Sequence, residues 1–231
     1  MGVKEKTFNY ISVGRESYRN VRSQILDKGY RLSTGEEVSS LIQAAYSPEE
    51  GNYKFFKIRK RIEKSAIRNL MDEGLFVFNR NLWTRDGVYV IQDSDSTKRN
   101  YELDIKNLEK VVNEGEKIDG VKFSKDKSIR FAPVGSYSGE NYRIEKFTKD
   151  GFIIASFGKD GAEKIGNIAF NFGINFNDIP RTYLRSIQGD APPIQTVSII
   201  TRKKYRKQAF VLIDALLDDD SYHGSGFGMY K

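Results

Sequence analysis

The sequence predicts an α+β protein in which helices come first and strands mixed with helices follow. Three observations predict this class. Apolar residues recur at helical spacing in the first third of the chain. Strand-like and helix-like segments alternate in the remainder, with no fixed repeat. Hydrophobic residues make up 39% of the 231 positions, including 15 Phe and 13 Tyr, which is enough to close a core.

Three helices are expected in the first third. The first covers about residues 14–28, where apolar side chains fall on one face. The second opens at a capping box, in which Thr34 is followed three residues later by Glu37. The third covers residues 54–73 and ends at Gly74, a residue type common just after helices.

Two strands are expected directly after these helices. Residues 75–83 and 88–92 are rich in aromatic and β-branched side chains, and Asp86-Gly87 between them is a hairpin turn signal. The polar stretch 93–100 that follows is the best candidate for a domain boundary.

The boundary divides the chain into a helical module with a hairpin, residues 1–97, and an α+β domain, residues 98–231. A single continuous domain remains the alternative. The expected elements of the second part are a helix at 104–113, a hairpin at 120–133, a strand, glycine loop and helix within 151–170, and two strands with a basic connection within 194–220.

The third helix carries an unusual charge pattern. Apolar residues fall on one side of it, and cations gather on the other within a wedge of about 120°. A solvated helix face normally mixes both signs, so a nearly single-signed face favours an acidic partner. A plain solvated helix remains the alternative. The six cations are Lys54, Lys57, Lys60, Arg61, Lys64 and Arg68.

The order of three helices and a hairpin resembles a winged helix-turn-helix module, an architecture rather than a particular family. In such modules the third helix enters the DNA major groove. The resemblance implies a winged-helix-like N-terminal module that binds DNA more readily than RNA, with Arg85 near the wing and within reach of phosphates.

A second basic segment, "TRKKYRK" at 201–207, lies between the two last predicted strands. As a hairpin tip it could enter a groove, or it could lie on RNA with its aromatic ring stacked on a base. Alternatively, lysines at strand ends simply discourage edge-to-edge aggregation. The candidate contacts are Arg202, Lys203, Lys204, Tyr205, Arg206 and Lys207.

An enzymatic alternative rests on carboxylates near the end of the sequence. Asp214 shares an apolar strand face, where a carboxylate is costly unless it is paired. Asp218, Asp219, Asp220 and His223 follow closely enough to complete an oxygen-rich Mg²⁺ site for a phosphodiester or nucleotide substrate, with Asp214 and His223 as the catalytic candidates. The competing interpretation is a solvated acidic loop, and the catalytic residues stay undetermined.

Composition narrows the function classes. The chain has no cysteine and one histidine, which excludes thiolate chemistry and multi-histidine metal sites. A net charge of +7 favours acidic partners. No apolar run is long enough for a membrane span, so no membrane partner is expected. A charged fraction of 30% without cysteine suits a cytoplasmic protein. No cofactor is expected unless the Mg²⁺ alternative holds, a protein-interaction scaffold is the third possibility, and the oligomeric state is left open.

Overall fold

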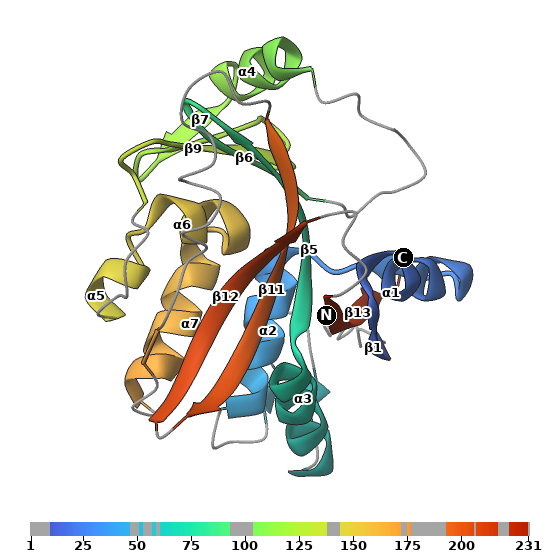
Figure 1. Cartoon of the computed structure of the whole chain (residues 1–231). Helices are drawn as coiled ribbons and strands as arrows, with labels where there is room; N and C mark the ends of the chain where they lie inside the picture. Colours follow the sequence, from blue (N-terminus) through green and yellow to red (C-terminus); the bar gives the residue numbers. More distant parts are fainter. Residues whose placement is uncertain are drawn as a thin grey trace, which may run out of the picture.

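The protein has an α+β fold, described by a computed structural model (Figure 1). No helix in the described part of the chain is both long and apolar enough to cross a membrane. The described residues are 10–46, 51–52, 57–58, 61–92, 104–137, 144–171, 175–176, 193–205, 207–216 and 222–230.

A long sheet forms the centre of the molecule. Its strands are hydrogen-bonded in the order β10-β12-β11-β5-β6-β9-β8-β7, and every neighbouring pair is antiparallel except β10 with β12. In the same order, the strands are Asn175–Phe176, Lys207–Leu216, Ile194–Tyr205, Leu75–Thr84, Gly87–Gln92, Ile129–Pro133, Val121–Phe123 and Glu116–Ile118.

A smaller set of strands joins the two ends of the sequence. β13 (His223–Met229) pairs with β1 (Tyr10–Ser17) and β2 (Arg31–Leu32), and its Ser225 pairs with Leu75 of β5. The helix expected from residue 14 therefore begins only at Tyr18, because the preceding residues form β1. A partner more than 200 positions away in the sequence provides that pairing, so helical periodicity alone gave the wrong boundary.

Helices cover both faces of the sheet. α2, α6 and α7 bury one face, together with Ile67 and Met71 of α3, whereas α1 and α4 pack in separate clusters on the other face (Figure 1). The helices are α1 (Tyr18–Asp27), α2 (Gly35–Tyr46), α3 (Arg61–Glu73), α4 (Ile105–Asn113), α5 (Ile144–Phe147), α6 (Gly151–Phe157) and α7 (Lys159–Asn171).

The predicted capping box at the start of α2 is confirmed. The Thr34 amide donates to Glu37 Oε2 at 2.9 Å, and the Glu37 amide donates to Thr34 Oγ1 at 3.3 Å. The Glu37 carboxylate is almost fully buried and also accepts two hydrogen bonds from the Arg31 guanidinium. This pairing compensates the burial of a charge and fixes the first turn of α2.

The strand expected near residues 152–157 is wrong, since the segment is the helix α6. Asp150 is its N-cap and accepts hydrogen bonds from the amides of Phe152 (2.9 Å) and Ile153 (3.1 Å). Every residue of α6 is buried, so the run is apolar all round and carries no helical period. A fully buried helix and a buried strand look alike in such a short run.

The expected wing is also wrong, although its two strands and its turn are confirmed as β5 and β6. β5 lies between β11 and β6, and β6 lies between β5 and β9, so both strands are internal to the sheet. A wing must protrude to reach DNA, whereas nearly all of β5 and β6 is buried. Segments from both sides of residue 97 share this one sheet and its largest core cluster.

Candidate nucleic-acid interface

The β11–β12 hairpin extends beyond the sheet at one end. β11 pairs with β5 from Ile194–Trp83 as far as Ile200–Leu75, whereas its pairing with β12 continues to Tyr205–Lys207. Residues 201–205 of β11 therefore run about 17 Å past the start of β5. This confirms that the basic segment is the tip of a hairpin, and we call the part beyond β5 the ribbon. β10 pairs with Ala209 and Phe210 on its β12 side, so only the last two pairs, Lys204–Gln208 and Tyr205–Lys207, lie beyond both neighbouring strands.

The ribbon carries most of the cations of the second basic segment. Arg202, Lys203 and Lys204 lie on β11 and Lys207 lies on β12, and the backbone of these positions is described. Tyr205 is the last residue of β11, and Arg206 lies outside the described residues. No Asp or Glu occurs between positions 195 and 213, so the ribbon has no acid of its own.

Helix α3 lies at the same end of the molecule as this ribbon (Figure 1). α3 packs beside β11, and the Thr201 hydroxyl donates to the Met71 carbonyl oxygen at 3.0 Å. Arg61 and Lys64 stand in the first turns of α3, three residues apart. Elements from two basic segments that are about 140 residues apart in the sequence thus pack together, with the Thr201–Met71 contact at the C-terminal turn of α3.

We call this region the basic end. It consists of six positions, all with described backbones: Arg61, Lys64, Arg202, Lys203, Lys204 and Lys207.

The predicted basic helix is shorter than expected. It begins at Arg61 rather than at residue 54, and Lys57 instead pairs with Asn52 in a two-stranded ladder of β3 (Gly51–Asn52) and β4 (Lys57–Ile58). Aromatic and β-branched residues in this stretch suit an extended chain as well as a helix. The single rod carrying six cations is therefore wrong, and Lys54 and Lys60 lie outside the described residues.

Arg68 packs against the end of α2. Its Nε donates to the Ala45 carbonyl oxygen at 3.0 Å, and its guanidinium carbon lies 4.9 Å from the centre of the Tyr46 ring. A cation at the C-terminus of a helix satisfies an otherwise unpaired carbonyl group and interacts favourably with the helix dipole. Arg68 thus joins α3 to α2 and is not part of the basic end.

Arg85 lies far from the other predicted contacts. It is exposed in the turn that joins Thr84 of β5 to Gly87 of β6. The whole ten-residue length of β5, roughly 30 Å, separates this turn from the end of α3. The expected surface that combined Arg85 with the basic helix is therefore wrong, because it depended on a protruding wing.

The residues of the enzymatic alternative are spread over the fold. Asp214 lies on β12 opposite Ser198 of β11, and His223 is the exposed first residue of β13, opposite Ser17. Two strands, β11 and β5, separate β12 from β13 in the pairing. Asp218, Asp219 and Asp220 lie outside the described residues. Within the described part of the chain, no three His, Cys, Asp or Glu side chains gather into a metal-binding group.

Sequence reasoning missed a buried charged cluster on the other half of the sheet. Arg130 of β9 is 1% exposed and pairs with Glu36 of α2, donates to the Ala155 carbonyl oxygen at 3.0 Å and lies over the Phe123 ring. Burial lowers the pKa of Arg130, while Glu36 opposes that effect. Gln92 also donates to Glu36, at 3.0 Å. No spacing signal links these residues, because each comes from a different element.

A second missed feature is a row of buried polar side chains on β5 and β11. The Asn81 side-chain amide donates to Ser198 Oγ at 2.8 Å, and Trp83 Nε1 donates to Thr196 Oγ1 at 3.0 Å. Phe78, next to this row, has a φ of 54° where the register between β5 and β11 shifts. The row ties the two strands together in the interior, and we interpret it as a structural feature rather than a binding site.

Comparison of the chain with protein-family models, with curated proteins and with solved structures found no match.

Proposed function

We propose that this protein binds nucleic acid, duplex DNA in preference to RNA, through the basic end. One observation supports the proposal above all others: α3, which carries Arg61 and Lys64 from the end of the first basic segment, packs beside β11, which continues into the basic ribbon. Two separate solvated charge runs would have no reason to converge. A polyanion is the class of partner that such a surface attracts.

The charge distribution supports a polyanion over a small acidic ligand. The four ribbon cations occupy two paired strands, and Arg61 and Lys64 extend the same sign onto α3. Cations spread over two elements suit the regularly spaced phosphates of a nucleic-acid backbone better than they suit a single small anion.

The shape of the ribbon favours duplex DNA. Its tip, where Lys204 pairs with Gln208 and Tyr205 with Lys207, is two-stranded. A two-stranded β-ribbon fits the major groove of B-form DNA, whereas the major groove of A-form RNA is too deep and narrow for side chains to read.

The Mg²⁺-dependent alternative remains a prediction from the sequence. Its test is incubation of the protein with labelled DNA and RNA, with Mg²⁺ and with a chelator. Metal-dependent cleavage that is lost in Asp214→Asn would favour the enzyme, and intact nucleic acid under all conditions would leave binding as the activity.

The proposed binding is tested by fluorescence anisotropy with a labelled DNA duplex of about two helical turns and an RNA duplex of the same sequence. If all six cations of the basic end contact phosphates, log K falls against log salt with a slope of about −5. Lys203→Ala/Lys204→Ala is expected to reduce that slope by about two, because two contacts are lost. A matched control is Lys106→Ala/Lys110→Ala on α4, which removes the same charge from exposed positions far from the basic end.

The proposal fails if the chain does not bind DNA at low salt. It also fails if the α4 variant weakens binding as much as the ribbon variant, because net charge alone would then explain the affinity. Tighter binding to RNA than to DNA would contradict the groove argument while leaving the basic end as the interface.

A further inference from the structure

The junction between α3 and β5 turns on a single glycine. Gly74 follows the last residue of α3, has a φ of +95° and donates to the Met71 carbonyl oxygen at 3.3 Å. A side chain is strained in this conformation, and a Cβ here would lie 3.1 Å from Ile199 Cγ2. A one-residue joint of this kind would let α3 pivot unless other contacts held the helix in place.

Contacts from two strands hold α3 at this joint. On one side, the backbone amide of Ser225 donates to the Gly74 carbonyl oxygen at 2.7 Å, and its hydroxyl donates to Glu73 Oε2 at 3.2 Å. On the other side, Thr201 is 8% exposed and its hydroxyl donates to the Met71 carbonyl oxygen at 3.0 Å. Carbonyl groups in the last turn of a helix need such outside donors.

Thr201 occupies a special place along β11. It is the first residue after the last β5 pair, Ile200–Leu75, and the next three residues are Arg202, Lys203 and Lys204. The side chain that ties down α3 therefore belongs to the same strand as the ribbon cations. Any rotation of α3 about Gly74 would break this bond and change the spacing between the helix cations and the ribbon cations.

We infer that Thr201 is a positioning residue that locks α3 to the ribbon, so that Lys64 and Lys203 contact one nucleic-acid duplex as a single rigid surface. The inference rests on the proposed function. Rigid elements bind more tightly than loosely coupled ones because they lose less conformational entropy on binding. Thr201 itself needs no contact with DNA in this role.

The test compares Thr201→Val, which keeps the side-chain shape but removes the hydroxyl, with Thr201→Ser, which keeps the hydroxyl. We expect the valine variant to bind a DNA duplex about five- to tenfold more weakly, and the serine variant to bind like the wild type. If circular dichroism shows that the valine variant is not folded, Thr201→Ala provides the same comparison. Equal losses in the serine and valine variants would indicate a packing role and overturn the inference.

A double-mutant cycle with Lys64→Ala separates positioning from general stability. In the wild-type background, loss of Lys64 should weaken binding about fivefold at low salt. In the Thr201→Val background the additional loss should be small, because α3 no longer holds that cation at a fixed position relative to the ribbon. An unchanged Lys64 effect in the valine background overturns the inference while DNA binding stands. Absence of DNA binding by the wild-type chain overturns the proposed function, and this inference with it.

Discussion

The two ends of the molecule are both rich in lysine, but they handle its charge differently. At the end formed by α4 and β7 to β9, residues 104–131 contain seven cations and six acids. Lys127 pairs with Glu116 at 2.9 Å, Lys125 with Glu114 at 3.7 Å and Lys159 with Asp119 at 3.0 Å. The ribbon at the basic end has five cations within residues 202–207 and no acid.

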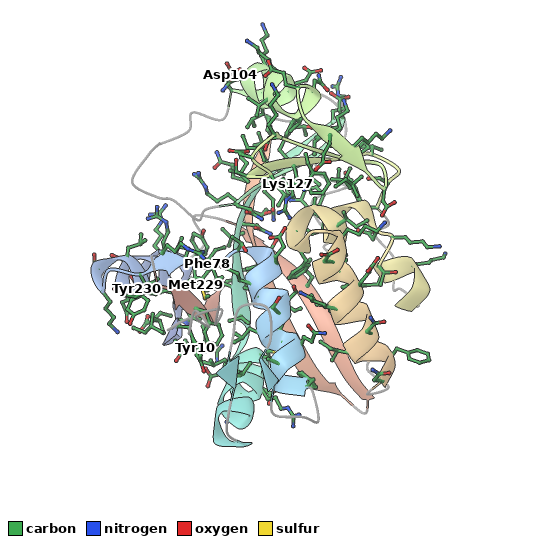
Figure 2. The ribbon with its side chains drawn as sticks, turned by 180° about the vertical axis from the view of Figure 1, so that it is seen from behind. Tyr10, Phe78, Asp104, Lys127, Met229 and Tyr230 are labelled. Atoms are coloured by element: carbon green, nitrogen blue, oxygen red, sulfur yellow. The ribbon has the colours of Figure 1, made fainter. Side chains whose placement is uncertain are left out.

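This difference teaches that the amount of charge is less informative than its pairing. Interleaved charges keep a surface hydrated and neutral, as the pairs around β7 to β9 do. A single-signed surface costs stability through self-repulsion, and a partner of opposite charge removes that cost. We call the end formed by α4 and β7 to β9 the interleaved end. Figure 2 shows its Asp104 and Lys127 away from Tyr10 of β1 and Met229 of β13. The predictions below test this contrast, from the largest expected effect to the smallest.

The interleaved end is anchored by the pair of the buried Arg130 and the partly exposed Glu36. Arg130→Met leaves the partly exposed Glu36 without its charged partner, and we expect a loss of about 2–3 kcal/mol in the free energy of unfolding, measured by urea denaturation, below the value for a fully buried pair because solvent reaches Glu36. Adding Glu36→Gln should restore part of that loss, because the unpaired charge is removed. DNA affinity should stay unchanged at a temperature where the variant is folded. A loss below about 1 kcal/mol would mean that the pair is not a structural anchor.

Charge reversal at the two ends tests the contrast most sharply for binding. Lys203→Glu/Lys204→Glu and Lys106→Glu/Lys110→Glu each lower the net charge by four, but only the first pair lies in the basic end. We expect the first variant to lose about a hundredfold in DNA affinity near 0.1 M salt and the second to lose less than about threefold. Anisotropy titrations measure both. Equal losses would remove the distinction between the ends.

Alkaline pH tests Tyr137, a partly buried residue whose ring packs edge-on against Trp83 of β5. Burial raises the pKa of Tyr137 to about 12, with the Asp150 charge adding to the rise. As the pH rises above about 10, Tyr137 ionises in the unfolded chain while it stays neutral in the folded protein. The free energy of unfolding is therefore highest below that pH and falls as the pH approaches 12. Tyr137→Phe should show a shallower fall in the urea midpoint over this range. Identical falls in the two proteins would refute a buried neutral phenol.

The exposed pair of Lys127 and Glu116 should contribute least. Both side chains are more than half exposed, at 59% and 53%, so solvent screens their attraction. Lys127→Ala should change the free energy of unfolding by at most about 0.5 kcal/mol and leave DNA affinity as it was. A larger loss of stability would indicate that the exposed pair stabilises the fold, and weaker binding would indicate that the interleaved end contacts DNA.

Local signals predicted a good part of the fold. The Thr34–Glu37 capping box and the Asp86-Gly87 turn each involve residues only a few positions apart, and both are observed in the structure. The failures involve long-range contacts or full burial. β1 depends on β13 at the other end of the sequence, and α6 is buried on all sides. Glycines in β13 let α1 pack closely, since a Cβ at Gly226 would lie 2.5 Å from Val21 Cγ1.

The candidate interface was predictable only in pieces. The basic composition of residues 201–207 and their place in a hairpin could be read directly, because alternation and charge are local properties. Their proximity to α3 could not, since it depends on β11 pairing with β5 and on Thr201 reaching Met71. The pattern of apolar and basic residues before Arg61 fits either a helix or a strand. In the structure, residues 57–58 form the strand β4, which pairs with β3.

Amide hydrogen exchange with and without a DNA duplex tests the central claim most directly. The account predicts that DNA slows exchange together in the first turns of α3 and in residues 201–205 of the ribbon, while the amides of α4 and of β7 to β9 keep their rates. Slower exchange confined to α4 and β7 to β9, or no change anywhere under conditions that saturate binding, would contradict it.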